Sequence, residues 1–293
     1  MAGRIAVVRA CEMFLPEDER ICSDPYAIRF IDPATRQALE QNPLAFRTIL
    51  AHIESMLPGI SGAIVARVRC FDEFTLQAVQ AGATQVLIFG AGYDTRAYRM
   101  IDLEKIRIFE IDQPETIRVK KENIREIFGS LPDNVSYVPA DLDTVGPSIA
   151  LEGSGFDPEQ RTVVLMEGLV MYLSPASVDQ LLAGIRDITP PGSSILFDYC
   201  PADDGTHSRA GWDTGRSAAA FVDQQGEPLK SGIAGPIDEF LIKRGFSGVR
   251  AMNGNDLRRV YFTGPKSGRT ICGIYGIASA IVDHNGCTLE DRV

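Results

Sequence analysis

Residues 86–96 read Val-Leu-Ile-Phe-Gly-Ala-Gly-Tyr-Asp-Thr-Arg, and this stretch decides the fold. Its first four residues are apolar, which is typical of a strand buried on both faces in a parallel sheet. Gly90 and Gly92 follow where open α/β sheets bind ligands, and glycine lets the backbone approach a ligand closely. The dinucleotide fingerprint has a third glycine where this chain has Thr95, and Asp94 brings a negative charge to the start of the next helix. The stretch therefore predicts a ligand site that disfavours a pyrophosphate.

An acidic residue ends the next apolar run. Asp112 follows residues 106–111 and lies about 20 residues beyond the glycines, where an acid accepts hydrogen bonds from the hydroxyls of a ribose. A ribose without a pyrophosphate fits S-adenosyl-L-methionine, which joins adenosine to an amino acid through a cationic sulfonium. The alternative is that Gly90 and Gly92 only make a tight turn and that Asp112 caps a helix.

Short apolar runs alternate with helical stretches along the chain after residue 80. The expected strands are 86–89, 106–111, 135–138, 163–166, 195–199, 246–250 and 272–282. This alternation predicts a parallel sheet with crossover helices. The last two strands are joined without an obvious helix, so we expect them to form an antiparallel hairpin at the edge of a seven-stranded sheet.

Two other segments differ in character from the sheet. Residues 1–80 read as helical, with apolar residues at helical spacing in 45–57 and 64–79 and a break at Pro58 and Gly59, so we expect a helical cap. Residues 201–235 are polar and glycine-rich and too long for an ordinary connection, so we expect a lid. We expect one structural unit made of the cap, 1–80, and the sheet domain, 81–293.

The composition narrows the classes of function. The net charge of −10 over 293 residues disfavours binding to nucleic acid and to anionic membrane surfaces. The 6 cysteines and 3 histidines are scattered, so neither a disulfide framework nor a metal site is indicated. Neither an apolar run of about 18 residues nor a signal-peptide core occurs, so we expect a soluble protein of the cytoplasm.

Several ordered motifs resemble one known family. The sequence is similar to the leucine carboxyl methyltransferases, which are class I S-adenosylmethionine-dependent methyltransferases with a Rossmann-like sheet. The similar motifs are 66–69 (ARVR), 71–74 (FDEF), 90–96 (GAGYDTR), 109–114 (FEIDQP), 140–142 (ADL) and 167–173 (EGLVMYL), with weaker matches at 24–27, 240–241 and 245–246. Nearly the whole chain is covered.

The resemblance implies a set of cofactor-binding residues. Arg67 would hold the carboxylate of the cofactor, since a guanidinium can bind a carboxylate through two hydrogen bonds. The alternative for Arg67 is a surface ion pair with Asp72 or Glu73. Asp112 would take the ribose hydroxyls. The other residues assigned to the cofactor site are Gly90, Ala91, Gly92, Gln113, Asp141, Leu142 and Glu167, with Asp141 and Leu142 at the adenine.

Glu167 ends a wholly apolar strand, where a buried carboxylate is unfavourable unless a cation lies near it. The sulfonium or the ammonium of the cofactor would supply that cation, and a neighbouring arginine is the alternative. Tyr172 could point its hydroxyl into the site or belong to the core. His207 in the lid could act as a base for an alcohol or phenol acceptor.

Methyl transfer from a sulfonium needs alignment of the reacting atoms and exclusion of water. We expect an S-adenosylmethionine-dependent O-methyltransferase that acts on a carboxylate or hydroxyl oxygen of a small molecule and releases S-adenosyl-L-homocysteine. Carboxyl methylation of a protein or peptide is an alternative. An NAD-dependent oxidoreductase and a non-catalytic cofactor-binding protein remain further alternatives. The sequence leaves the acceptor and the oligomeric state open.

Overall fold

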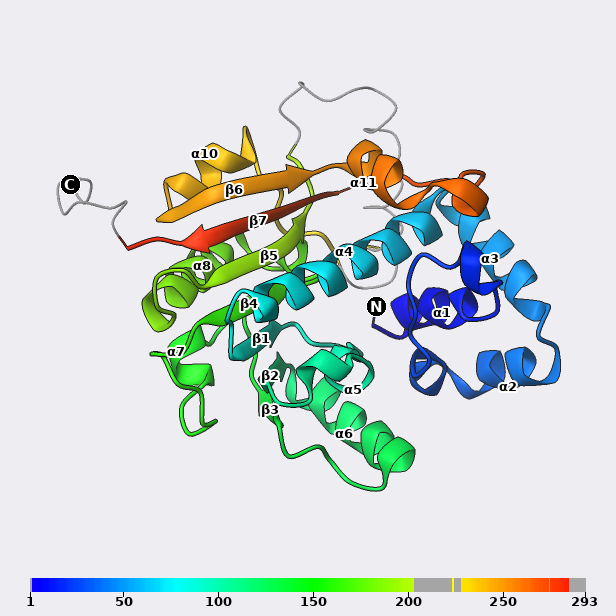
Figure 1. Cartoon of the computed structure of the whole chain (residues 1–293), viewed down its shortest axis with the longest axis horizontal. Helices are drawn as coiled ribbons and strands as arrows, with labels where there is room; N and C mark the ends of the chain where they lie inside the picture. Colours follow the sequence, from blue (N-terminus) through cyan, green and yellow to red (C-terminus); the bar gives the residue numbers. More distant parts are fainter. Residues whose placement is uncertain (1, 203–222, 224–227, 274, 285–293) are drawn as a thin grey trace.

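The computed structural model describes residues 2–202, 223, 228–273 and 275–284, and it contains a seven-stranded sheet in the order β3-β2-β1-β4-β5-β7-β6 (Figure 1). Its strands are β1 (Gln85–Phe89), β2 (Arg107–Asp112), β3 (Val135–Pro139), β4 (Thr162–Met166), β5 (Ser194–Tyr199), β6 (Phe246–Met252) and β7 (Gly276–Val282). Strands β1 to β5 pair in parallel, and β7 runs antiparallel to both β5 and β6. The predicted seven-stranded sheet with an antiparallel last strand is confirmed.

The connection between the last two strands differs from the prediction. A helix, α11 (Gly254–Tyr261), and a short 3-10 helix, η5 (Gly264–Lys266), lie between β6 and β7, so the prediction of a hairpin without a helix was wrong. Asn253 begins α11 with a capping box, in which its side chain accepts from the backbone N–H of Asp256. The last strand also begins at Gly276 rather than at Cys272, because the backbone N–H of Cys272 instead donates to the carbonyl of Gly59.

Helices cover both faces of the sheet and leave the carboxyl ends of the parallel strands accessible. On one face, α4 (Ile60–Gln80) and α11 share an apolar core with β1 and β4. On the other face lie α7 (Pro147–Ala150), α8 (Pro175–Ile188) and α10 (Ile237–Ile242). The remaining helices of the sheet region are α5 (Arg96–Arg99), η3 (Ile101–Leu103), α6 (Pro114–Phe128) and η4 (Val170–Tyr172).

The N-terminal helices form a separate apolar cluster beside the sheet, as the prediction of a helical cap requires (Figure 1). They are α1 (Ala2–Glu12), η1 (Glu17–Glu19), η2 (Ala27–Phe30), α2 (Pro33–Gln41) and α3 (Ala45–Met56). Residues 60–80 instead pack on the sheet as α4, and the division of the chain at residue 80 stays a prediction.

A sharp corner joins α3 to α4, whose axes differ by 103°. Glu54 at the end of α3 accepts hydrogen bonds from the N–H groups of Gly59, at 2.6 Å, and Ser61, at 3.1 Å, and so caps the start of α4. Gly59 has a φ of +81°, and a Cβ added there would lie 2.5 Å from the backbone nitrogen of Cys272. The corner therefore requires glycine at this position. Among the described helices none is long and apolar enough to cross a bilayer alone, and this bent pair passes only when taken together.

Candidate functional site

A cavity of about 1690 Å³ opens at the carboxyl ends of the parallel strands. The glycine loop after β1 and the residues that follow β2, β3 and β4 line one part of it, and helices α1 and α3 line another. The structure brings together on this cavity all the predicted site residues that it describes: Arg67, Gly90, Ala91, Gly92, Asp112, Gln113, Asp141, Leu142, Glu167 and Tyr172. The remaining prediction, His207, lies outside the described residues.

The backbone of the glycine loop, residues 90–92 after β1, is held by the carboxylate of Asp112 at the end of β2. One carboxylate oxygen of Asp112 accepts from the N–H of Gly92 at 2.6 Å, and the other accepts from the N–H of Gln113 at 2.7 Å. Gly90 has a φ of +66°, and a Cβ added there would come within 3.0 Å of the Leu169 side chain. The loop therefore requires glycine at position 90, and Asp112 both lines the cavity and fixes the backbone above it.

The side chain of Gln113 links the ends of two strands. Its amide nitrogen lies 3.4 Å from a carboxylate oxygen of Asp141, which follows β3. The same oxygen of Asp141 accepts from the N–H of Asp143 at 3.1 Å. The residues after β2 and β3 thus present oxygen acceptors side by side along the cavity.

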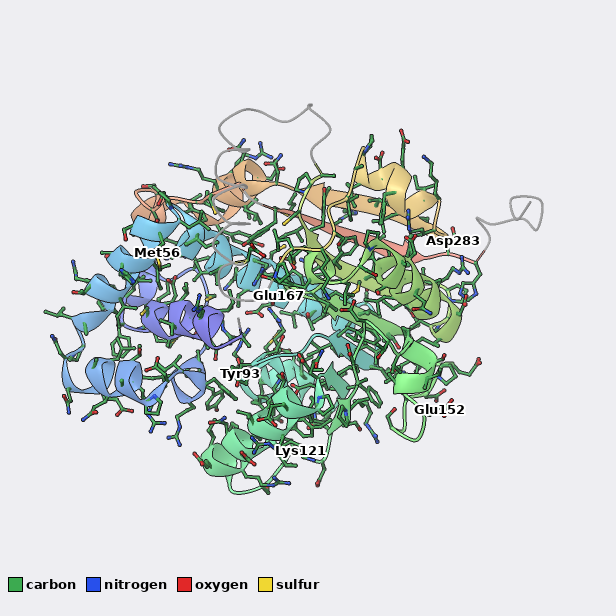
Figure 2. The ribbon with its side chains drawn as sticks, turned by 180° about the vertical axis from the view of Figure 1, so that it is seen from behind. Met56, Tyr93, Lys121, Glu152, Glu167 and Asp283 are labelled. Carbon is green, nitrogen blue, oxygen red and sulfur yellow. The ribbon has the colours of Figure 1, made fainter. Side chains whose placement is uncertain are left out.

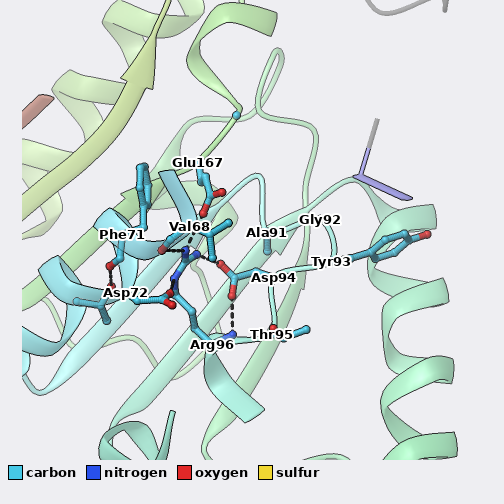
Figure 3. Close-up of polar contacts among 12 residues, drawn as sticks. Val68, Phe71, Asp72, Ala91, Gly92, Tyr93, Asp94, Thr95, Arg96 and Glu167 are labelled. Atoms are coloured by element: carbon cyan, nitrogen blue, oxygen red, sulfur yellow. Dashed lines mark hydrogen bonds and ion pairs between the residues drawn. The ribbon is translucent and has the colours of Figure 1, made fainter. Parts of the chain in front are cut away.

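A buried arginine lies behind the glycine loop (Figure 3). Arg96, which is 2% exposed, donates to Asp72 and to Glu167, each at 2.8 Å, and forms a third ion pair with Asp94. Arg99 also pairs with Asp72, at 2.7 Å. One arginine therefore connects α4, the glycine loop and the end of β4.

A second arginine completes this network. The Nε atom of Arg67 lies 3.1 Å from Glu167, and its Nη1 atom lies 2.7 Å from Asp198 at the end of β5. The second oxygen of Asp198 accepts from the N–H of Gly168 at 2.6 Å. The alternative of a surface ion pair between Arg67 and Asp72 or Glu73 is therefore not what the structure contains. These contacts involve Nε and Nη1, and the Arg67 side chain also lines the cavity.

Glu167 lies near the centre of the molecule, and both of its oxygens contact guanidinium groups (Figure 2). Burial acts to raise the pKa of Glu167, but Arg96 and Arg67 outweigh it, so the pKa lies below its usual value. Burial likewise opposes ionisation of Asp94, yet Arg96 and Lys120 lower its pKa to about 2. At Asp198 burial prevails over Arg67 and raises the pKa. Asp94 and Glu167, which both line the cavity, therefore stay ionised at neutral pH.

Three parts of this arrangement are not among the residues predicted from the sequence. Arg96 belongs to the 90–96 motif, but the motif alone gives it no role. Asp198 could have been found, because it is an acid near the end of an apolar strand, as Glu167 is. Helix α1 also contributes, since Arg9 donates to the carbonyl of Tyr93 at 2.7 Å and pairs with Asp24 at 3.0 Å. Nothing in the sequence of α1 indicates that it lies against the glycine loop.

The segment predicted as a lid is fastened at its described ends. The N–H of Lys230 donates to the carbonyl of Met171 at 2.8 Å, and its ammonium pairs with Asp143. Ala202 and Ile233 form a backbone hydrogen bond of 2.8 Å. Ala202 and Lys230 both line the cavity, so both described ends lie at it, and the function of the segment as a lid stays a prediction.

Relatives of known sequence are named as S-adenosyl-L-methionine-dependent methyltransferases. One from Mycolicibacterium smegmatis is 38% identical over 69% of this chain and 66% of its own length. One from Mycobacteroides abscessus is 31% identical over 68% of this chain and 66% of its own length. One from Mycobacterium avium is 36% identical over 51% of this chain. The matched region spans 47% of that last relative, so the chain covers only about half to two thirds of these proteins.

Two solved structures share the fold along nearly the whole chain. A protein of the DUF574 family from Streptomyces avermitilis superimposes with a TM-score of 0.60 at 15% identity and covers 94% of this chain and 96% of its own. A protein from Thermobifida fusca, described as a methyltransferase, gives a TM-score of 0.58 at 14% identity over 94% of this chain and 97% of its own. At these identities the likeness concerns the fold alone.

The family comparison agrees with the motifs. The sequence profile described as leucine carboxyl methyltransferase matches residues 2–186, which include α1, the glycine loop, the acid after β2 and the end of β4. The chain belongs to the leucine carboxyl methyltransferase family.

Proposed function

We propose that the protein transfers the methyl group of S-adenosyl-L-methionine to an oxygen atom of a small-molecule acceptor. One observation carries the proposal: every described residue assigned to the cofactor lines a single cavity, whose volume of about 1690 Å³ leaves room for a second molecule. Ligand pockets commonly measure about 300–1,000 Å³. The names of the relatives include S-adenosyl-L-methionine, and the match to the leucine carboxyl methyltransferase family agrees with this cofactor.

The residues present suit the parts of this cofactor. The guanidinium of Arg67 can hold a carboxylate, while Asp94 and Glu167 offer negative charge to a cation. Asp112 and Asp141 offer acceptors to ribose hydroxyls and to the adenine amino group. Gly90, which lines the cavity, has no side chain to project into it, and a Cβ there would come within 3.0 Å of the Leu169 side chain. When bound, the cofactor supplies an electrophilic methyl group on a sulfonium.

The carboxylates of the cavity are poorly suited to act as bases. In the described part of the cavity, each carboxylate already has a partner. Asp94 and Glu167 pair with arginines, and Asp143 pairs with Lys230. Asp112 and Asp141 accept hydrogen bonds from backbone N–H groups. An acceptor carboxyl group, with a pKa of about 4, is ionised at neutral pH and needs no base. We therefore infer that a carboxylate is the favoured acceptor, whereas a hydroxyl would rely on His52, the histidine in the described lining.

The protein's own part in the reaction is to hold the methyl donor and to exclude water from the reacting atoms. Arg67, Asp112 and Glu167 fix the donor at the strand ends, so that the acceptor oxygen can approach the methyl group in line with the departing sulfur. The apolar residues around the cavity keep water from the reacting atoms. A donor held by Arg67, Asp112 and Glu167 would supply its methyl group to the acceptor oxygen and would keep the electron pair of the broken carbon–sulfur bond.

Asp112→Ala should weaken the binding of S-adenosyl-L-homocysteine at least tenfold, because it removes the acceptor for the ribose and also the support of the Gly92 N–H. Isothermal titration calorimetry measures the affinity. The control is Asp179→Ala, which removes an exposed acid paired with Arg244 away from the cavity. Unchanged affinity in Asp112→Ala, or tighter binding of NAD than of S-adenosyl-L-homocysteine by the native protein, would contradict the assignment.

The class of acceptor oxygen can be read from the product. With methyl-labelled S-adenosyl-L-methionine and 4-phenylbenzoic acid, the label should enter a methyl ester, which releases methanol on brief treatment with alkali. The phenol of the same size, 4-phenylphenol, would give an ether that survives this treatment. Label that appears only in the alkali-stable product would contradict the preference for a carboxylate.

A further inference from the structure

Helix α3 carries an apolar stripe that the protein covers only in part: Ile49 and Ile53 are partly buried against the core, whereas His52 and Met56 are exposed. Its apolar residues recur at helical spacing, yet Phe46 is the residue of α3 that is buried. Ile49, His52, Ile53 and Met56 lie three or four positions apart, so they share one face of the helix, and all four line the cavity. Met56 is 41% exposed. We call these four residues the α3 stripe.

The α3 stripe belongs to the same cavity as the cofactor residues but comes from a different part of the molecule. In Figure 2, Met56 lies among the N-terminal helices and Glu167 near the centre. Between them the cavity wall continues through Leu57, Ile60 and Ile64 at the start of α4. The hydroxyl of Tyr275, which also lines the cavity, is directed to the carbonyl of Ala63.

Resting on the proposed function, we propose that the α3 stripe and the adjoining start of α4 form the wall that recognises the methyl acceptor, and that this acceptor is a large, mostly apolar small molecule. Ile49, Ile53 and Met56 favour contact with apolar surface, which gains free energy by leaving water. His52 is the polar member of the stripe and can bind one polar group of the acceptor. The stripe carries neither a carboxylate nor an ammonium group, so it offers little to a highly charged acceptor.

The continuity of the cavity favours the acceptor as the occupant. An apolar surface that only supported the fold would be covered by other side chains, as Phe46 is. The α3 stripe is covered only in part, and all four of its residues line space that is continuous with the glycine loop and Glu167. The corner at Glu54 and Gly59 fixes α3 relative to α4, so the stripe has a defined place in the cavity wall.

A matched pair of variants tests this assignment. Met56→Glu puts a charge into the stripe, whereas Ser55→Glu puts the same charge one residue away, in the same turn and off the cavity. The probe is Nile red, a neutral apolar dye, titrated by fluorescence into protein saturated with S-adenosyl-L-homocysteine. Met56→Glu should bind the dye at least tenfold more weakly than the native protein. Ser55→Glu should stay within twofold, and both variants should keep native affinity for S-adenosyl-L-homocysteine.

The outcomes separate this inference from the proposed function. Failure of the native protein to bind S-adenosyl-L-homocysteine would refute the proposed function itself. Normal binding of S-adenosyl-L-homocysteine, with equal dye affinity in both variants or with no dye bound to the native protein, would refute the role of the α3 stripe alone. Ile53→Ala provides a second test, since removing apolar surface should also weaken dye binding without adding a charge. A native dye affinity in Ile53→Ala would likewise count against the stripe.

Discussion

Arg96→Met should lower the free energy of unfolding by about 3–5 kcal/mol, the usual cost of removing one partner from a buried ion pair. The side chain is 2% exposed and contacts Asp72, Asp94 and Glu167. Methionine fills a similar volume but leaves these carboxylates without a common partner. Urea unfolding followed by circular dichroism measures the change.

The surface provides the control for this substitution. Arg118→Met removes an arginine that also pairs with two acids, Glu115 and Glu122, but does so in solvent. Its unfolding midpoint should stay close to the native one, because exposed pairs contribute little. Arg96→Lys should remain well below native stability, since an ammonium cannot reproduce the planar set of donors. Native stability in Arg96→Met would show that the network is not needed for folding.

The network also explains why Asp94 stands at the start of the helix after the glycine loop. From the sequence, its charge was interpreted as a feature that disfavours a pyrophosphate. In the structure Asp94 pairs with Arg96 and accepts from the backbone N–H of Arg96 at 2.7 Å. The charge of Asp94, which we interpret as disfavouring a pyrophosphate, is thus held in place by Arg96.

The sheet could be predicted because its central strands are apolar after their first residue. Strands β1 and β4 are buried at every position, and after Gln85 and Thr162 their sequences are continuous apolar runs. Helix α11 could not be predicted by the same argument. Gly254 and Leu257 are its buried residues, and the helix has only 8 residues, so Leu257, Val260 and Tyr261 are too few apolar positions to distinguish it from a loop.

The position of the site could be predicted, but its internal partners could not. Carboxyl ends of parallel strands meet at one edge, so acids that end strands must lie near one another. Their partners come from far along the chain: Arg67 is 100 residues from Glu167 and 131 from Asp198. A buried Glu167 is expected to need a cation nearby, and the structure supplies the guanidinium groups of Arg67 on α4 and Arg96 on α5. Such pairings depend on how α4 lies on the sheet. No local sequence pattern predicts that arrangement.

Another buried ion pair lies next to the glycine loop. The ammonium of Lys120 on α6 is 2.8 Å from a carboxylate oxygen of Glu110 on β2, and both side chains have no exposed surface. The hydroxyl of Tyr98 donates to Glu110, and Tyr137 shares a hydrogen bond of 2.9 Å with Tyr98. Lys120 also reaches the carbonyl of Ala91 in the glycine loop, at 3.5 Å. The pair therefore connects the core of the sheet to the glycine loop of the candidate site.

Lys120→Met should lower the free energy of unfolding by about 3–5 kcal/mol, because it leaves Glu110 buried without its cation. Adding Glu110→Gln should recover part of this loss, since the neutral amide no longer requires a cation and can still accept from Tyr98. Urea unfolding of both single variants and the double variant gives the coupling energy. The control is Lys243→Met, whose ammonium is paired with Glu239 on the surface. A double variant as unstable as the sum of the two singles would show that the pair is not coupled.

The same pair should make stability depend on pH. Burial raises the pKa of Glu110 from 4.5 to about 7, although Lys120 opposes this by favouring the charged form. A carboxyl group with a raised pKa binds its proton more tightly in the folded protein than in the unfolded chain. Its contribution to stability is therefore full below pH 4.5 and is lost as the pH rises through about 7. The unfolding free energy of the native protein should fall relative to that of Glu110→Gln over this range, because glutamine does not titrate. Parallel pH profiles for the two proteins would show that Glu110 keeps its ordinary pKa, and that Lys120 holds it ionised throughout.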